Sequence, residues 1–171
     1  MSFLGFVTLE ATLKGSAITR SSTHVPTNGD SLPTYRIYGP NGLMTSGTGT
    51  TSFRNTGSIT GTDTSSPILI TSASHGLTTG TRVTITGVVG QTGANGTFVI
   101  TNVSANTFTL DGSTSVGAWV SGGTWNVSGL YLVSHSILAA SGYEAGTTYS
   151  ILVSFAISST SGGEVYTFIA A

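Results

Sequence analysis

The sequence contains no cysteine and few charged residues. Its 171 residues include five Lys and Arg and six Asp and Glu, so 6% of the chain is charged, against ~25% in a typical globular protein. Without cysteine, neither a disulfide framework nor a thiolate metal site can form. Five scattered basic residues and a net charge of −1 cannot make a phosphate-binding patch, which argues against a nucleic-acid partner.

Long apolar runs are also missing. No stretch approaches the roughly 18 consecutive apolar residues of a membrane-spanning helix, so we expect no membrane partner. Residues 3–7 are apolar, but no basic segment precedes them and Glu10 interrupts the run. We therefore expect no secretory leader, and release by lysis if the protein acts outside a cell.

The residues that are abundant favour strands. Thr, Ser and Gly fill 80 positions, yet 38% of the chain is apolar, which is too hydrophobic for a disordered segment. The good polar helix formers are nearly absent, with one Lys, one Gln and three Glu. Apolar and polar residues alternate along 7–13, 82–86 and 149–157, as in half-buried strands. The sequence predicts an all-β fold.

Composition divides the chain in two. Residues 1–57 and 128–171 hold most of the aromatic side chains, and the polar stretch 57–66 has the composition of a linker. The two outer pieces together have the size of one immunoglobulin-like sandwich. We therefore expect 1–57 plus 128–171 to form an Ig-like β-sandwich, with 58–127 inserted as a small β-barrel-like or β-sandwich domain. A single continuous sandwich is the alternative.

The middle segment carries a specific resemblance. The residues that carry it are 68–77 (ILITSASHGL), 80–88 (GTRVTITGV), 95–100 (NGTFVI), 105–112 (ANTFTLDG) and 121–125 (SGGTW). They resemble a repeat module of tailed-bacteriophage structural proteins, and are similar to the small β-domain named for the first catalytic cysteine half of ubiquitin-activating enzymes. In that enzyme family the module has no catalytic cysteine, so the resemblance implies a fold and no ubiquitin chemistry.

The flanks carry a second resemblance. Residues 30–39 (DSLPTYRIYG) and 142–149 (GYEAGTTY) look like the Ig-like domains of phage virion proteins. In those domains a Gly-Tyr-x-x-Gly corner precedes an alternating strand. The resemblance implies a passive virion component and places the insertion between residues 57 and 129.

No catalytic, cofactor-binding or metal-ligating constellation stands out. His24, His75 and His135 are the only histidines, and none has ligands at metal-site spacing. We expect His75 to brace a turn through backbone hydrogen bonds, His135 to be an interface or half-buried residue of a strand, and His24 to be solvated. The six acidic residues are isolated in the sequence, whereas a glycosidase needs a facing pair. Asp63, in a Thr- and Ser-rich loop, comes closest to a calcium loop.

Three aromatic residues remain as candidates for binding. Trp119 and Trp125, with Tyr131 nearby, could contact a glycan or a protein partner if their rings are exposed. The alternative is that each ring fills the small core of its domain.

These observations lead to two hypotheses, and neither of them is an enzyme. The first is a non-enzymatic structural component of a tailed-phage virion, an auxiliary capsid protein that decorates or cements the shell. It would assemble as a homo-oligomer and dock on major capsid or tail proteins, since a nearly uncharged surface offers little repulsion to association. The second is a tail, fibre or baseplate component that binds host-surface carbohydrate.

Overall fold

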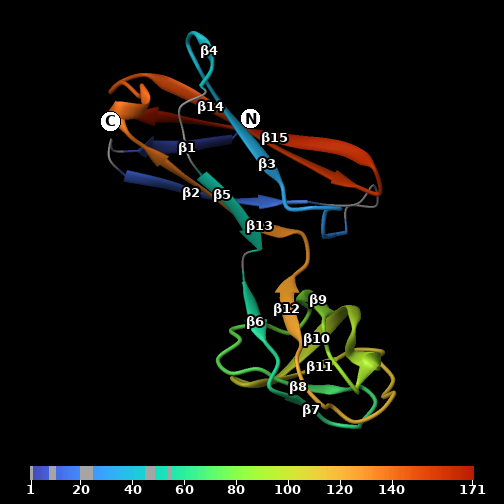
Figure 1. Ribbon diagram of the computed structural model, residues 1–171. Helices are drawn as coiled ribbons and strands as arrows, with labels where there is room; N and C mark the ends of the chain where they lie inside the picture. The colour runs from blue at the N-terminus through green and yellow to red at the C-terminus, as the bar shows by residue number, and fades with distance from the viewer. Residues whose placement is uncertain (1, 8–10, 20–24, 45–48, 54) are drawn as a thin grey trace. The chain divides into compact units, whose positions relative to one another are not determined.

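The computed structural model describes every residue except 1, 8–10, 20–24, 45–48 and 54 (Figure 1). The prediction of an all-β fold is confirmed, because the described elements are strands and short 3-10 turns. The chain divides into two compact units. Met1–Phe53 and Gly129–Ala171 form the first, which we call the sandwich unit, and Arg54–Ser128 form the second, the inserted unit. In the described part of the chain no helix is both long and apolar enough to cross a membrane.

The sandwich unit has two sheets, with strand orders β1-β15-β14-β3-β4 and β2-β13-β5. Its strands are β1 (Ser2–Val7), β2 (Ala11–Ile18), β3 (Thr34–Gly39), β4 (Gly42–Leu43), β5 (Gly49–Phe53), β13 (Leu130–Ile137), β14 (Thr148–Ile157) and β15 (Thr160–Ala170). β1 runs parallel to β15, and β14 pairs antiparallel with both β15 and β3. Strands from both ends of the chain therefore share each sheet, as expected for an Ig-like sandwich.

Alternating side chains from the two sheets form the core of this unit. In β13 every second residue is buried, because successive side chains of a strand point to opposite faces. The buried residues of this core are Ile37, Tyr131, Val133, Ile137, Tyr143, Tyr149, Ile151, Val153, Phe168 and Ala170. Apolar contacts between the sheets thus hold the sandwich together.

The Gly-Tyr-x-x-Gly segment makes the corner that leads into β14. The hydroxyl of Tyr149 accepts a hydrogen bond from the backbone N–H of Glu144 at 2.8 Å, and its ring stacks on Phe168 with centroids 5.6 Å apart. A tyrosine at the start of this strand that bonds to the backbone a few residues upstream is a hallmark of immunoglobulin-like domains.

Asp30 fixes the turn between β14 and β15. Its two carboxylate oxygens accept the backbone N–H groups of Ser158 and Ser159 at 2.9 and 2.8 Å. Both serines have positive φ, 50° and 63°, as a two-residue type I′ hairpin turn requires. A serine side chain is disfavoured in this conformation.

We expect a sequence suited to this turn to stabilise the sandwich unit. The double substitution Ser158→Asn and Ser159→Gly should raise the free energy of unfolding by roughly 1 kcal/mol, because Asn and Gly tolerate positive φ. Urea unfolding measures the change. Ser154→Gly, within β14, is the control and should destabilise by a similar amount, since glycine weakens a strand interior. A double variant less stable than the wild type would refute the assignment of the turn.

The inserted unit contains one curled sheet of order β6-β12-β9-β10-β11-β8-β7. Its strands are β6 (Thr56–Ser58), β7 (Gly61–Thr62), β8 (Leu69–Thr71), β9 (Arg82–Thr86), β10 (Gly96–Ser104), β11 (Thr107–Leu110) and β12 (Thr124–Val127). Its buried apolar residues are Ile59, Ile68, Ile70, Leu77, Val83, Ile85, Val88, Ala94, Ile100, Phe108, Leu110 and Trp125. Each unit therefore has a core of its own.

The insertion enters and leaves the sandwich through two paired strands. Phe53 at the end of β5 lies opposite Tyr131 in β13. The inserted unit therefore begins and ends next to neighbouring positions of one sheet. The inserted unit begins at Arg54, earlier than the expected residue 58, and ends at Ser128. The difference arises because β6 pairs with β12 inside the inserted unit, although residues up to 57 were expected to belong to the sandwich.

Candidate interaction surface

Two segments of the inserted unit, residues 87–93 and 113–123, run beside each other. The backbone N–H of Val89 donates to the carbonyl of Ser121 at 3.0 Å, and that of Val120 donates to the carbonyl of Val89 at 2.9 Å. These bonds form an isolated antiparallel bridge outside the main sheet. The two segments thus present one continuous surface.

Glycine permits the close approach of these segments. A Cβ atom on Gly90 would lie 2.1 Å from the carbonyl oxygen of Ala118, and one on Gly93 would lie 2.2 Å from that of Thr114. Neither backbone oxygen can move aside without shifting its segment. Any larger residue at these two positions would separate the segments.

The side chain of Gln91 ties the second segment to the rest of the unit. Gln91 is fully buried. Its Nε2 donates to the carbonyl of Asp63 at 3.1 Å and to Oγ of Ser115 at 2.8 Å, and its Oε1 accepts the backbone N–H of Val116 at 2.7 Å. A buried amide with all these bonds made is rigid, because breaking any of them leaves a polar group without water.

Asn95 fixes the first segment in the same way. Its Oδ1 accepts the backbone N–H of Val88 at 3.0 Å, and its Nδ2 donates to the carbonyl of Val88 at 2.9 Å. The side chain of Asn95 therefore both accepts a hydrogen bond from the preceding loop and donates one to it. Both segments are held in place by amide side chains.

Apolar side chains project from these fixed segments. Val89, Val116 and Val120 are 52%, 61% and 68% exposed, and we call these three residues the valine face. Trp119 lies between Val116 and Val120 in sequence, is half-buried against the core, and donates from Nε1 to the carbonyl of Gly122 at 3.1 Å. Exposed valines on a rigid surface are typical of a contact region.

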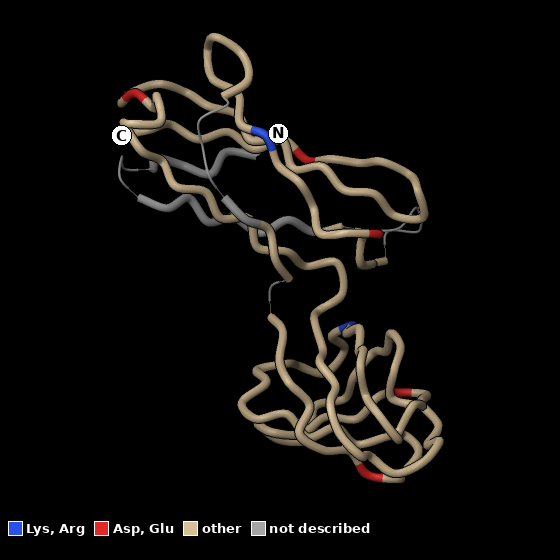
Figure 2. Tube along the Cα trace, viewed as in Figure 1, with Lys and Arg blue, Asp and Glu red and all other residues tan. Residues whose placement is uncertain are grey.

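Charge is absent from the same segments. Residues 87–93 and 113–123 contain no Lys, Arg, Asp or Glu. Figure 2 shows how sparse such residues are in the described parts of both units. A partner at this surface would contact apolar and hydroxyl groups only.

The other two aromatic candidates lie in the cores. Trp125 is 2% exposed, and its Nε1 donates to Oγ of Ser72 at 2.8 Å. Tyr131 is fully buried in the sandwich unit, where its hydroxyl accepts the backbone N–H of Gly29 at 2.8 Å and its ring stacks on Phe53. Rings without exposed faces cannot stack on a ligand, so only Trp119 stays a candidate for binding.

His75 bonds to the backbone through both ring nitrogens. Nε2 lies 2.9 Å from the carbonyl oxygen of Ser104, and Nδ1 accepts the backbone N–H of Leu77 at 3.0 Å. Nε2 therefore carries the proton. The prediction that His75 braces a turn is confirmed. His24 and Glu10 lie outside the described residues.

His135 is buried between two tyrosines. Its Nδ1 lies 3.0 Å from the hydroxyl of Tyr35, and its Nε2 lies 2.8 Å from that of Tyr143. Burial lowers the pKa of His135 and raises the pKa of Tyr35. The pKa of Tyr143 rises to about 12, through burial and the neighbouring Tyr149 and Tyr35. The three groups are neutral at pH 7 and stabilise the core.

The carboxylate of Asp63 has structural partners. Asp63 accepts the backbone N–H groups of Ser65 and Leu69 at 3.2 and 2.8 Å. Partial burial pushes the pKa of Asp63 upward, but these bonds outweigh it and lower the pKa overall. Among the residues whose placement is described, no three His, Cys, Asp or Glu side chains could hold a metal ion, and every buried side-chain nitrogen or oxygen has a partner.

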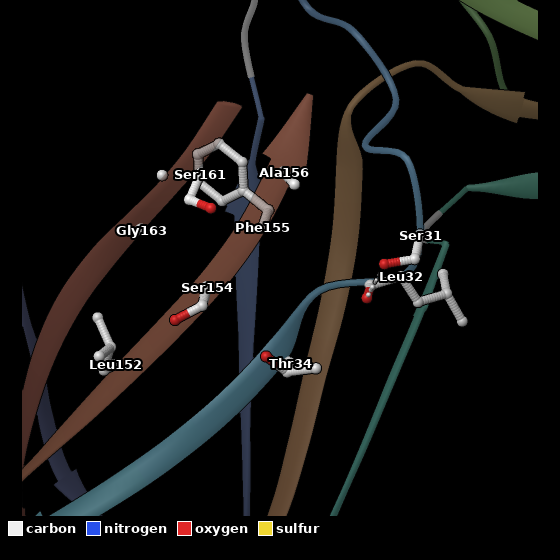
Figure 3. A pocket seen from close by; sticks show the side chains of 10 residues that line it. Ser31, Leu32, Thr34, Leu152, Ser154, Phe155, Ala156, Ser161 and Gly163 are labelled. Atoms are coloured by element: carbon white, nitrogen blue, oxygen red, sulfur yellow. Dashed lines mark hydrogen bonds between the residues drawn. The ribbon is translucent and has the colours of Figure 1, made fainter. Parts of the chain in front are cut away.

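A shallow trough of about 630 Å³ lies on the sandwich unit. Figure 3 shows side chains from β3, β14 and β15 and the segment before β3 around it. Its lining residues are Ser31, Leu32, Thr34, Leu152, Ser154, Phe155, Ala156, Ser161, Gly162 and Gly163. Gly162 lies opposite Phe155 in the β14–β15 pair, and a Cβ atom on it would lie 2.9 Å from the Phe155 ring. Since no lining residue is charged or titratable near pH 7, the trough offers no acid–base or metal chemistry.

Comparison with known families bears on the inserted unit. Residues 68–127 match the model of the ubiquitin-activating enzyme E1 FCCH domain. The expected resemblance of this segment to the small β-domain of those enzymes is confirmed. The matched residues fall within the inserted unit and include the valine face. No curated protein matches the chain.

Sequence reasoning did not find Gln91 or the valine face. The partners of Gln91 are 24 to 28 residues away, and nothing local marks such contacts. The one available signal is the departure from alternation in 87–93 and 113–123, where valines stand beside glycines.

Removal of the Gln91 amide should loosen the segment that carries Val116. We expect Gln91→Leu to lower the free energy of unfolding by about 2 kcal/mol, because the N–H of Val116 loses its acceptor and the carbonyl of Asp63 loses its donor. Urea unfolding followed by tryptophan fluorescence measures this. Thr92→Ala, at the exposed neighbouring residue, is the control and should change stability by less than about 0.5 kcal/mol. Equal stability of both variants would contradict the role given to Gln91.

Proposed function

We propose that this protein is a non-enzymatic structural component of a tailed-phage virion, an auxiliary capsid protein that decorates or cements the shell in many copies. The observation that carries the proposal is a fixed, apolar and uncharged surface on a chain in which 6% of residues are charged. Such a surface favours burial against neighbouring subunits, and small β-domains gain stability from that burial.

The resemblance of the flanks supports the same assignment. Residues 30–39 and 142–149 look like the Ig-like domains of phage virion proteins, and the corner made by Tyr149 lies in the second of these segments. A sandwich domain with a second β-domain inserted in one hairpin is suited to a structural subunit. One unit would bind the particle, and the other would remain exposed.

A decoration protein of this kind has capsid or tail proteins as partners and the virion as its location. The sandwich unit would dock on major capsid or tail proteins, further copies of the chain would contact one another, and the protein would reside in the virion. No cofactor, nucleic acid or membrane is part of it.

Copy number tests the proposal. Quantitative mass spectrometry of purified particles should find the chain in numbers comparable to those of the major capsid protein. A few copies per particle would refute the capsid role and favour the tail. Absence from washed particles would refute the virion assignment altogether.

Trp119 supports a second candidate, a tail, fibre or baseplate component that binds host-surface carbohydrate. Its half-buried ring lies beside exposed apolar and hydroxyl groups, and such a ring can stack on a sugar. Binding on a glycan array that Trp119→Ala abolishes, in a variant that still folds, would favour this candidate. No binding by the wild-type protein would exclude it for the glycans tested.

A further inference from the structure

The valine face is preorganised for contact. Its two segments are fixed by the buried amide of Gln91 and by the exposed amide of Asn95, which bonds to the backbone N–H and carbonyl of Val88. Valine has one strongly restricted side-chain torsion, so little conformational entropy remains to be lost when these residues are covered. Preorganisation of this kind strengthens association by lowering its entropic cost.

The lack of charge indicates which partner the face suits. In a twofold contact between identical chains, residues near the axis meet their own copies, so a charge there would face a like charge. Residues 87–93 and 113–123 contain no charge of either sign. Contacts between different proteins commonly use complementary charge for steering and specificity, and this face has none to offer. We infer that the valine face is the contact between two copies of this chain, related by a twofold axis near Val120.

The size of the face sets the strength of the contact. Three valines and part of one indole expose a few hundred Å² of apolar surface, less than the ~800 Å² per partner of a standard stable interface. The contact is therefore weak on its own, with a dissociation constant on the order of 100 μM. In an array of many copies, repeated weak contacts add up.

Sedimentation velocity over a range of protein concentrations tests this contact. The wild-type chain should shift from monomer to dimer as its concentration rises through the high micromolar range. Val120→Glu should remain monomeric, because it places two carboxylates together at the axis. The matched control is Val103→Glu, the same change at a valine that is 58% exposed near the far end of β10; it should dimerise like the wild type. Unchanged thermal unfolding of both variants shows that they fold.

A charge-swap mixture tests the twofold arrangement. Val120→Glu and Val120→Lys should each be monomeric alone, and an equimolar mixture should form heterodimers because opposite charges then meet at the axis. A wild-type chain that stays monomeric throughout, equal effects of Val120→Glu and Val103→Glu, or no association in the mixture would each overturn the inference. The test uses purified protein without particles, so its failure is distinct from failure of the virion assignment.

Discussion

Replacement of Trp125 by Ala should destabilise the inserted unit by about 4 kcal/mol, the usual cost of removing a large aromatic side chain from a core. The indole is 2% exposed and meets Phe108 edge-on, with ring centroids 6.3 Å apart. It also covers Gly57, where a Cβ atom would lie 2.7 Å from the ring. The substitution leaves a cavity and removes the hydrogen-bond donor to Ser72.

Tryptophan fluorescence can follow this unit specifically, because Trp119 and Trp125 are the two tryptophans of the chain and both lie in it. In the Trp125→Ala variant, Trp119 remains as the probe. The control is Trp119→Ala, which should cost about 1 kcal/mol because this ring is half-exposed. Equal losses in the two variants would contradict the assignment of Trp125 to the core and Trp119 to the surface.

Replacement of His135 by Ala should destabilise the sandwich unit by about 3 kcal/mol. The change leaves a cavity and removes the hydrogen-bond partner of the Tyr35 and Tyr143 hydroxyls. Urea unfolding followed by tyrosine fluorescence or circular dichroism measures the loss. Ser134→Ala, at the half-buried neighbour on the other face of β13, is the control and should change stability by less than about 0.5 kcal/mol.

The same residue should make stability depend on pH. Burial lowers the pKa of His135 in the folded state, so below about pH 6.5, the ordinary histidine value, the unfolded chain binds a proton that the folded chain excludes. The contribution of His135 is complete above that pH and is lost as the pH falls. The slope is at most about 1.4 kcal/mol per pH unit.

His135→Gln provides the comparison, because glutamine keeps a donor and an acceptor but does not titrate. We expect the stability of the wild-type chain to fall more steeply than that of His135→Gln between pH 7 and pH 5. Subtraction of the two profiles removes every contribution that the proteins share. Parallel profiles would show that His135 does not titrate differently on folding.

Two of the three alternating segments could be predicted as strands from the sequence. The third, 7–13, contains the end of β1 at Val7 and the start of β2 at Ala11, and residues 8–10 lie outside the described residues. Residues 149–157 fall within β14 (Thr148–Ile157) and 82–86 within β9, since burial of one face imposes a period of two. The corner at residues 142–149 was expected from the resemblance to Ig-like domains, and its hydrogen bond from Glu144 to Tyr149 closes within five residues. Sequence patterns thus predicted those strands and turns whose contacts lie close in the chain.

Features that depend on distant backbone groups could not be predicted. Thr56–Ser58 shows no apolar alternation, and residues up to 57 were expected in the sandwich, yet its backbone pairs with β12, since strand pairing leaves no mark on polar side chains. The strand β12 begins only at Thr124, because Gly122 and Gly123 just before it have φ of 70° and 107°. Composition could not predict that Trp125 is buried and Trp119 half-exposed, because burial of a ring depends on residues that are distant in sequence.

Excision of the inserted unit tests most directly whether distant ends of the chain form a self-sufficient sandwich. Replacing Arg54–Ser128 with Asn-Gly would join β5 to β13 through a short hairpin loop, because Phe53 and Tyr131 already lie opposite each other. The account predicts a folded chain with cooperative urea unfolding and slow hydrogen exchange in β13 and β14. A shortened chain without cooperative unfolding, or with unprotected amides in those strands, would contradict it.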